Sequence, residues 1–340
     1  MNNISIKFFS ALLLISATLM SAITAQAQST DFSVNGVLET EAAAGKNFDS
    51  QYYSSANVGK IEVEANKQVN KNLDVTFLFK FEDEGAESGE LDKAFLTVNS
   101  LLPGLKVFVG RLYLYEYFFE TQMISDAVSQ EIIELRMEGL SLQYSKANTI
   151  ANISFYKSQL ASEFDHKAEM VVDFSQNFLL GKQAEINIKG LYTSNLVDSQ
   201  HLSNLVEAEI DKHSPAFGLS LHLHSSFIDV TAQCVRAIES IDNSIISNNG
   251  EASTPSACQL ELGRSLSLLQ QDYFAIGYQW TDQAYDLGFP AAKLLASYHW
   301  SPIENLKLAI EISRSNDYDL NDGGTDNSDN TIVTQLAIEF

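Results

Sequence analysis

TIVTQLAIEF, the stretch from Thr331 to Phe340, alternates between two faces with a period of two residues. One face carries Ile332, Thr334, Leu336, Ile338 and Phe340, and the other carries Thr331, Val333, Gln335, Ala337 and Glu339. An alternating strand that ends the chain on an aromatic residue is typical of the strand that closes an outer-membrane β-barrel, because that strand must pair with the first or leave a sheet edge open in lipid. Taken alone, the stretch also fits an edge strand of a soluble sandwich.

Residues 1–27 have the features of a Sec signal peptide. Lys7 is their one charged residue, an almost wholly apolar run extends from Phe8 to Ile23, and Ala25-Gln26-Ala27 offers a small-x-small cleavage site. We expect cleavage after Ala27 and a single exported domain of residues 28–340. No later apolar run is long enough for a helical membrane span.

The charge balance is strongly acidic, with 21 Lys and Arg against 44 Asp and Glu and a formal net charge of −23. Binding to nucleic acid needs a basic face, so this balance argues against a nucleic-acid partner. It is compatible with the outer membrane, because the lumen and the outer loops of a barrel hold their charges in water.

Segments of alternating polarity recur along the chain, for example at Lys60–Asn66, Leu73–Glu82 and Leu306–Ser313. Seven short turns, near Asn70, Pro103, Asn148, Gly181, Ser225, Gln270 and Pro302, alternate with eight long connections, at 46–53, 83–90, 113–128, 158–165, 194–215, 239–255, 281–290 and 314–330. This pattern predicts an all-β, antiparallel transmembrane barrel of about sixteen strands, or fourteen if one of the weaker turns is misplaced, with short periplasmic turns and long extracellular loops. No stretch after the signal peptide has a helical period.

The connection 113–128, YLYEYFFETQMISDAV, is the strongest functional candidate. It is rich in aromatic and acidic residues and poor in turn residues, so we expect it to fold into the lumen and narrow the pore; a surface loop packed on its neighbours is the alternative. Its aromatics, Phe119 among them, would stack on a planar ligand, while charged residues set a transverse field. The predicted charged pore-lining residues are Arg111, Glu116, Glu120, Asp126, Glu134 and Arg136.

The two cysteines, Cys234 and Cys258, lie symmetrically about the connection 239–255 and share their faces with apolar residues. They should therefore face each other on the two arms of one hairpin. This predicts a cross-strand disulfide at the base of the loop, since export places the pair in an oxidising compartment. Two small buried thiols are the alternative.

Two other features suggest chemistry but have simpler explanations. Ser220, His222 and His224 share the polar face of one strand, which opposes large apolar residues, so we expect them in the lumen and expect no enzyme activity. The stretch from Asn316 to Asn330 has the Asp and Asn spacing of a calcium loop but lacks the closing Glu of an EF-hand, so we expect a hydrated outer loop, no metal site and no cofactor.

Five stretches together resemble the LbtU family of siderophore porins: NGVLETEAA (Asn35 to Ala43), GRLYLYEYFFETQMISDAVSQEIIELR (Gly110 to Arg136), TPSACQLELG (Thr254 to Gly263), GYQWTDQAYDLGFP (Gly277 to Pro290) and NDYDLNDGGTDNSDNTIVTQLAIEF (Asn316 to Phe340). The second stretch keeps the family's Gly-Arg start and its Phe-Glu-Thr and Met-Ile-Ser-Asp pieces. It departs from the family where Leu114-Tyr115-Glu116 replaces a Pro-Phe-Gly turn. The resemblance implies an outer-membrane barrel that admits a ferric siderophore without a plug domain.

These observations predict a passive porin in the cell outer membrane. The predicted first strand begins at Phe32, a few residues after the cleavage site, which leaves no room for a plug. The expected partners are outer-membrane lipid, a ferric siderophore or similar small polar solute, the barrel-assembly machinery acting on Phe340, and a second copy in a homo-oligomer. A general diffusion porin and a closed adhesive or structural barrel are the alternative functions.

Overall fold

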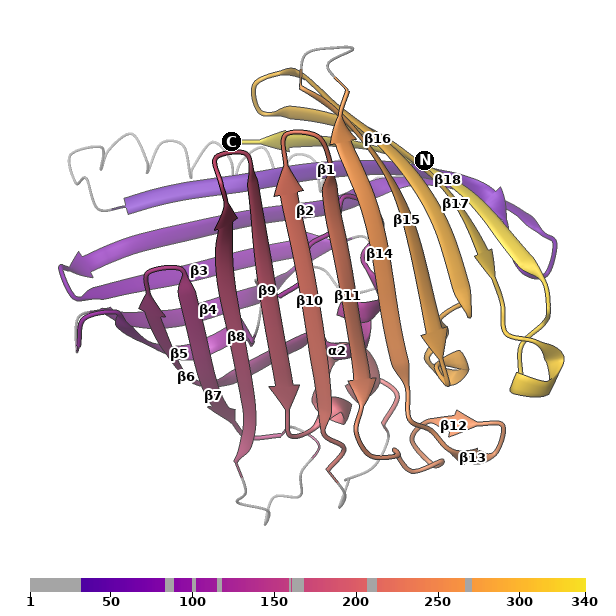
Figure 1. Cartoon of the computed structure of the whole chain (residues 1–340), viewed down its shortest axis with the longest axis horizontal. Coiled ribbons are helices and arrows are strands. Elements are labelled where there is room, and N and C mark those ends of the chain that lie inside the picture. Colours follow the sequence, from indigo (N-terminus) through magenta and orange to yellow (C-terminus); the bar gives the residue numbers. More distant parts are fainter. Residues whose placement is uncertain are drawn as a thin grey trace, which may run out of the picture.

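A computed structural model describes residues 32–82, 89–99, 102–114, 118–158, 160, 168–206, 213–266 and 271–340. Within these residues, sixteen antiparallel strands close into one barrel (Figure 1). They are β1 (Phe32–Lys46), β2 (Tyr52–Asn70), β3 (Leu73–Glu82), β4 (Glu90–Asn99), β5 (Leu105–Leu114), β6 (Leu135–Lys146), β7 (Thr149–Tyr156), β8 (Glu169–Leu180), β9 (Ala184–Thr193), β10 (Ala216–Ser225), β11 (Asp229–Ala237), β14 (Ser256–Ser265), β15 (Asp272–Asp282), β16 (Ala292–Ile303), β17 (Leu306–Asn316) and β18 (Ser328–Glu339). The predicted barrel of sixteen strands is confirmed, and the alternative of fourteen is wrong.

The terminal strand closes the barrel as its sequence predicts. β18 pairs antiparallel with both β17 and β1. At the seam the backbones of Gly36 and Phe340 exchange two hydrogen bonds, of 2.8 and 3.0 Å. The ring of Phe340 occupies the space where a side chain at position 36 would begin, 2.4 Å from the expected Cβ, so glycine fits there and a larger residue does not.

The alternation of residues sends apolar side chains outward and polar ones into the lumen. Phe79 is 56% exposed and Leu294 is 58% exposed on the outer face, whereas lumen-facing Glu311 is 1% exposed. A closed barrel with an apolar outer face leaves no unpaired strand edge, which is what a bilayer requires of a spanning sheet. The protein is therefore an outer-membrane barrel.

Long connections gather at one end of the barrel and short turns at the other, as Figure 1 shows. The long connections carry β12 (Ser247–Asn248), β13 (Glu251–Ala252), α2 (Val128–Ile133), α3 (Gln200–Ser203) and the 3-10 turns η1 (Leu196–Asp198), η2 (Tyr285–Leu287) and η3 (Leu320–Asp322). The sequence shows no helical period after the signal peptide, yet the structure contains these short helices. These helices have six residues or fewer, too few for a helical period to be read from the sequence.

Two predicted loop boundaries also need correction. β2 begins at Tyr52, so the first long connection is shorter than expected, and β5 includes Tyr113 and Leu114. The predicted loop 113–128 therefore starts later, and it continues through α2 to Glu134. Among the described residues, no helix is long and apolar enough to cross a bilayer. The predicted signal peptide, residues 1–27, lies outside the described residues and stays a prediction.

Candidate functional site

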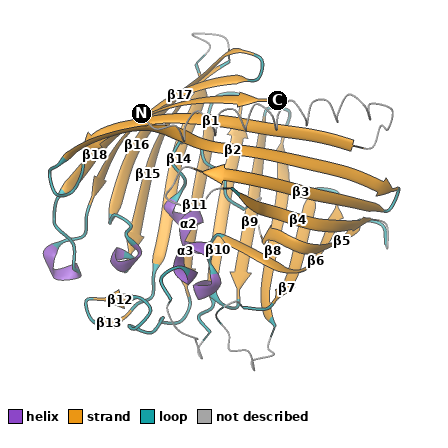
Figure 2. Cartoon of the chain, turned by 180° about the vertical axis from the view of Figure 1, so that it is seen from behind, coloured by secondary structure: helices purple, strands orange, loops and turns teal. Residues whose placement is uncertain are grey.

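The connection between β5 and β6 folds into the barrel. Its described part, residues 118–134, is called the inner loop below. Figures 1 and 2 show its helix α2 within the ring of strands, and α2 contacts β11, β14 and β15. The inner loop is held on one side by strands β9–β11 and β14–β17, called the anchoring wall.

Two carboxylates of the anchoring wall bind the backbone of the inner loop. Glu261 on β14 accepts hydrogen bonds from the amide of Gln122 (2.8 Å) and the hydroxyl of Thr121 (2.7 Å). Glu311 on β17 accepts from the amide of Ile124 (2.6 Å) and from the amide and hydroxyl of Ser125 (3.2 and 2.5 Å). Both carboxylates are 1% exposed. Because buried charges are costly unless they are hydrogen-bonded, these contacts fix where the loop must lie.

Neutral side chains of the same wall bind the loop carbonyls. The carbonyl of Gln122 accepts from Ser297 Oγ and from His299 Nε2, each at 2.8 Å. The carbonyl of Glu120 accepts from the side-chain amides of Gln233 (3.0 Å) and Gln259 (3.2 Å). The backbone of the inner loop therefore finds in the wall the partners that a helix or sheet would otherwise supply.

Glu120 adds an ionic contact to the anchoring wall. Its carboxylate lies 2.7 Å from His222 Nδ1 and 2.5 Å from Lys189 Nζ. The hydrogen bond from His222, supported by Lys189 and opposed by burial, lowers the pKa of Glu120 to about 2. The carboxylate therefore stays ionised at neutral pH and holds the start of the inner loop against β9 and β10.

A dry core fills the lumen between α2 and the outer loops. Val128, Ile132 and Ile133 of α2 are buried against Leu196 and Leu202 of the connection between β9 and β10. Val235 and Ala257 of the anchoring wall complete this core, together with Leu135 on β6 and Val171 on β8. The anchoring side of the lumen and the adjoining strands β6 and β8 are therefore packed like a protein interior.

Strands β2–β5, called the open wall, face the inner loop across a cavity of about 350 Å³. The inner loop lines it with Phe119, Asp126, Gln130 and Glu134, and the open wall lines it with Lys60, Glu62, Leu78, Lys80, Glu82, Asp92, Lys93, Tyr113 and Leu114. The acids of the loop thus face three lysines that are interspersed with acids. We call this cavity the constriction.

Burial controls the charge on the loop side of the constriction. It raises the pKa of Asp126, and the nearby Lys60 and Lys80 oppose that rise. It also raises the pKa of Glu134 to about 7, and the charge of Asp126 adds to this effect. The charge of the loop side therefore changes near neutral pH.

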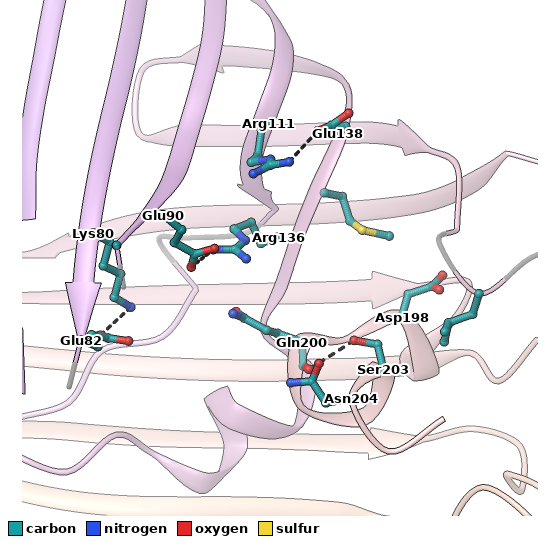
Figure 3. A pocket seen from close by; sticks show the side chains of 13 residues that line it. Lys80, Glu82, Glu90, Arg111, Arg136, Glu138, Asp198, Gln200, Ser203 and Asn204 are labelled. Atoms are coloured by element: carbon teal, nitrogen blue, oxygen red, sulfur yellow. Dashed lines mark hydrogen bonds and ion pairs between the residues drawn. The ribbon is translucent and has the colours of Figure 1, made fainter. Parts of the chain in front are cut away.

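A second cavity, of about 570 Å³, leads from the constriction toward the long loops. We call it the vestibule. Figure 3 shows its charged side chains in pairs. Arg111 is directed at Glu138 (2.8 Å) and Arg136 at Glu90 on other strands, and Lys80 is directed at Glu82 (2.7 Å) on the same strand β3. Both cavities include Lys80 and Glu82, so they meet at β3.

The vestibule is bounded on its far side by the connection after β9. Gln200, Ser203 and Asn204 present polar groups there (Figure 3). Asp198 supports this segment, because its carboxylate accepts hydrogen bonds from Ser158 and from Asn195 Nδ2 (3.0 Å). Burial raises the pKa of Asp198, and these hydrogen bonds oppose the rise.

The predicted site residues occupy three places. Arg111 and Arg136 line the vestibule, and Phe119, Asp126 and Glu134 line the constriction. Glu120 lines neither cavity, because it is bound to the anchoring wall. Glu116 lies outside the described residues.

Sequence reasoning missed the anchoring role of Glu261 and Glu311. Each alternates with outward apolar neighbours, as in Leu260-Glu261-Leu262, and this pattern marks an acid that faces the lumen. This alternation does not indicate which atoms of the inner loop each acid binds.

The other chemical candidates have structural explanations. Ser220 is 1% exposed, and its neighbour His222 on β10 contacts Glu120, so the inner loop covers both. In the outer loop between β17 and β18, Asp317 and Asp319 accept hydrogen bonds from backbone amides of that same loop. Among the described residues, no group of three His, Cys, Asp or Glu is arranged to hold a metal ion.

Cys234 and Cys258 are directly opposed on β11 and β14, with their Cα atoms 4.0 Å apart and a disulfide joining their sulfurs. Both side chains alternate with lumen-facing Gln233 and Gln259, so the pair lies on the outer face of the barrel. It is therefore separated from the inner loop by the thickness of the wall.

These features define a porin-like outer-membrane barrel, narrowed by one inward-folded loop. No protein-family model matches the chain. In sequence it is similar to a UPF0422 protein of Coxiella burnetii, 21% identical over 333 residues that cover 90% of this chain and 71% of that protein. It is also similar to the UPF0422 protein lpg2959 of Legionella pneumophila, 20% identical over 327 residues, 83% of this chain. The match spans 61% of the length of that Legionella protein.

Solved porin structures share the fold. OmpF of Salmonella typhi, in complex with daunomycin, gives a TM-score of 0.65 at 12% identity and covers 91% of this chain and 97% of its own. The outer-membrane channel DcaP of Acinetobacter baumannii gives 0.62 at 15% identity, with coverage of 91% and 97%. OprB of Pseudomonas putida gives 0.65 at 11% identity, with coverage of 91% and 94%. At these identities the likeness concerns the fold.

Proposed function

We propose that the protein is a passive outer-membrane channel that admits small polar solutes along its open wall. One observation carries this proposal: the inner loop is bound to the anchoring wall, while its acids face lysines across the constriction. Charged groups on both sides of such a path orient a polar solute and screen its charge as it passes.

A ferric siderophore is the specific solute that the resemblance to the LbtU family supports. The paired charges of the vestibule suit a polar chelate that carries several oxygen groups. A general diffusion porin accounts for the same lumen equally well, and the acid excess then favours cations over anions.

A closed adhesive or structural barrel is the rival, and the dry core on the anchoring side of the lumen favours it. Two measurements separate the three functions. The purified protein is inserted into planar bilayers for single-channel conductance, and cells with and without the gene are compared for uptake of iron-59 chelates.

Conductance together with gene-dependent iron uptake supports a siderophore porin. Conductance without any change in iron uptake supports a general porin. No conductance overturns the channel proposal and leaves the adhesive barrel. The matched variants for the conductance assay are Asp126→Asn in the constriction and Glu339→Gln at the periplasmic end, and only the first should change ion selectivity.

We further propose that the barrel-assembly machinery recognises the terminal strand through Phe340, whose side chain is exposed. Removal of Phe340 should lower the amount of folded barrel in the outer membrane. Heat-modifiable migration on gels measures this amount, with Phe340→Trp as the conservative control. A separate measurement, the mass of the protein in detergent, tests whether copies of the barrel associate.

A further inference from the structure

We propose that the outer wall of the barrel carries a binding site for a phosphorylated, acylated lipid of the outer leaflet. Lys46 and Arg314 would bind the phosphate, and an apolar groove beside them would receive the acyl chains. This inference concerns the outside of the barrel and does not rest on the proposed channel function.

The groove is a cavity of about 950 Å³ that extends across the outer faces of β15–β18, β1 and the start of β2. Its lining consists of Ala44, Gly45, Lys46, Tyr52, Tyr53, Ile276, Leu294, Leu295, Ala296, Ile312, Ser313, Arg314, Asn330, Thr331 and Ile332. The small side chains of Ala44 and Ala296 leave room between the larger ones.

The strand register arranges the outward-facing residues of the groove, with Tyr278 and Ser54 beside it, in two rows. The row nearer the long loops runs Tyr52, Lys46, Asn330, Arg314, Leu294 and Tyr278, each opposite the next on a neighbouring strand. The row nearer the membrane centre runs Ser54, Ala44, Ile332, Ile312, Ala296 and Ile276. The polar row therefore lies above an almost entirely apolar one, in the order that a headgroup and its acyl chains require.

The two cations lie two strands apart, about 10 Å between backbones, given the usual spacing of strands. Long Lys and Arg side chains can converge on one phosphate from that separation, and the Arg guanidinium binds phosphate oxygens in a bidentate manner. Arg314 is exposed and donates a 3.4 Å hydrogen bond to Ser328 Oγ, and the guanidinium has further donors for a phosphate.

Charge complementarity identifies the occupant. The chain has more than twice as many acidic as basic residues, yet none of the described residues that line the groove is acidic. Two cations without a carboxylate beside them favour an anionic headgroup. If a second copy of the barrel occupied the groove instead, it would need carboxylates on its own surface to pair with Lys46 and Arg314.

The depth of the cations in the membrane agrees with this assignment. Tyr52 is 86% exposed beside Lys46, and Tyr278 stacks on Trp280 at the other end of the row, with ring centroids 5.6 Å apart. Tyr and Trp collect at membrane–water interfaces, where lipid phosphates also lie. The side of the long loops is the external side, so the lipid belongs to the outer leaflet.

Native mass spectrometry of the full-length protein in detergent tests the site. The probes are a diphosphorylated, multiply acylated glycolipid and the same lipid with its phosphates removed. A cation near a membrane surface contributes about 1 kcal/mol to the binding of anionic lipid, so Lys46→Ser with Arg314→Ser should weaken binding about thirtyfold. Arg236→Ser, which removes an exposed cation from the outer end of β11, is the matched control and should change binding little.

Equal binding of the two lipids, or equal binding by the double variant, would overturn the proposal. Competition by millimolar inorganic phosphate would show a site for free phosphate and overturn the assignment to lipid. A change of oligomeric mass in the double variant would instead assign the groove to a second copy. Conductance of the double variant should match the wild type, which separates this test from that of the channel.

Discussion

The two sides of the lumen make different contacts with the inner loop. The anchoring wall binds the loop backbone with buried carboxylates, amides and hydroxyls, and the adjoining space is filled by an apolar core. The open wall meets the loop across charged side chains and a cavity. The inner loop therefore packs against one half of the barrel and lines a cavity in the other half, and its backbone hydrogen bonds determine which half it packs against.

The strongest test of this comparison removes the anchors. In Glu261→Ala with Glu311→Ala, the amides of Gln122, Ile124 and Ser125 lose their acceptors. Each hydrogen bond to a charged group contributes about 1.5–3 kcal/mol, so we expect the loop to detach. Single-channel conductance should rise well above the wild-type value and fluctuate, and the loop should become sensitive to protease.

The control for this experiment is Glu339→Ala, which removes an exposed carboxylate at the end of β18 that pairs with Lys307. Its conductance should equal that of the wild type, because exposed ion pairs contribute little. Unchanged conductance in the double variant would show that the core of α2, and not the carboxylates, holds the loop.

The core of α2 provides the second test. Ile132 is fully buried between the helix and the barrel, so Ile132→Ala should leave a cavity and cost about 2–5 kcal/mol of stability. The midpoint of urea unfolding measures the loss. Ile310→Ala, on the lipid face of β17, is the matched control and should cost less, because its side chain is 40% exposed. Equal losses would mean that the packed side of the lumen is no better ordered than the outer face.

The barrel could be predicted from the sequence because its signals are local. Alternation with a period of two, the spacing of the turns and the aromatic terminus each depend on neighbouring residues. The same rule places Glu261 in the lumen and Leu262 outside it. The count of sixteen strands then follows from the order of long and short connections.

The anchoring of the inner loop could not be predicted in this way, since it depends on contacts between distant parts of the chain. Glu261 binds Thr121 across 140 positions of sequence, and no local pattern records such a pairing. The partners of Glu120 could not be predicted for the same reason. Lys189 and His222 of the anchoring wall, which bind its carboxylate, lie 69 and 102 positions later in the sequence.

A third test uses pH to change the charge on the side of the inner loop that faces the open wall. The pKa of Glu134 is raised to about 7 by burial, so this carboxyl is neutral below that pH and negative above it. One unit charge about 10 Å from the path changes the free energy of an ion by about 0.4 kcal/mol in water, or its occupancy about twofold. Preference for cations over anions should therefore increase between pH 6 and pH 8.

Reversal potentials in a salt gradient measure this preference. Glu134→Gln should abolish the increase in cation preference near pH 7. Glu138→Gln, an exposed carboxylate of the vestibule, is the control and should retain it. A step that survives in Glu134→Gln would assign the titration to another group.

The smallest effect on ion flow is expected at the outer face, where Cys234 and Cys258 join β11 to β14. A disulfide that closes a loop of this length stabilises a fold by about 3 kcal/mol, mainly by restricting the unfolded chain. Cys234→Ser with Cys258→Ser should therefore lower the urea midpoint and leave conductance unchanged, because the pair lies on the far side of the wall from the inner loop. A reductant should have the same effect on the wild type and none on the variant. A change in conductance would mean that the hairpin between β11 and β14 shapes the pore, so that the packed side of the lumen is set from outside as well as from within.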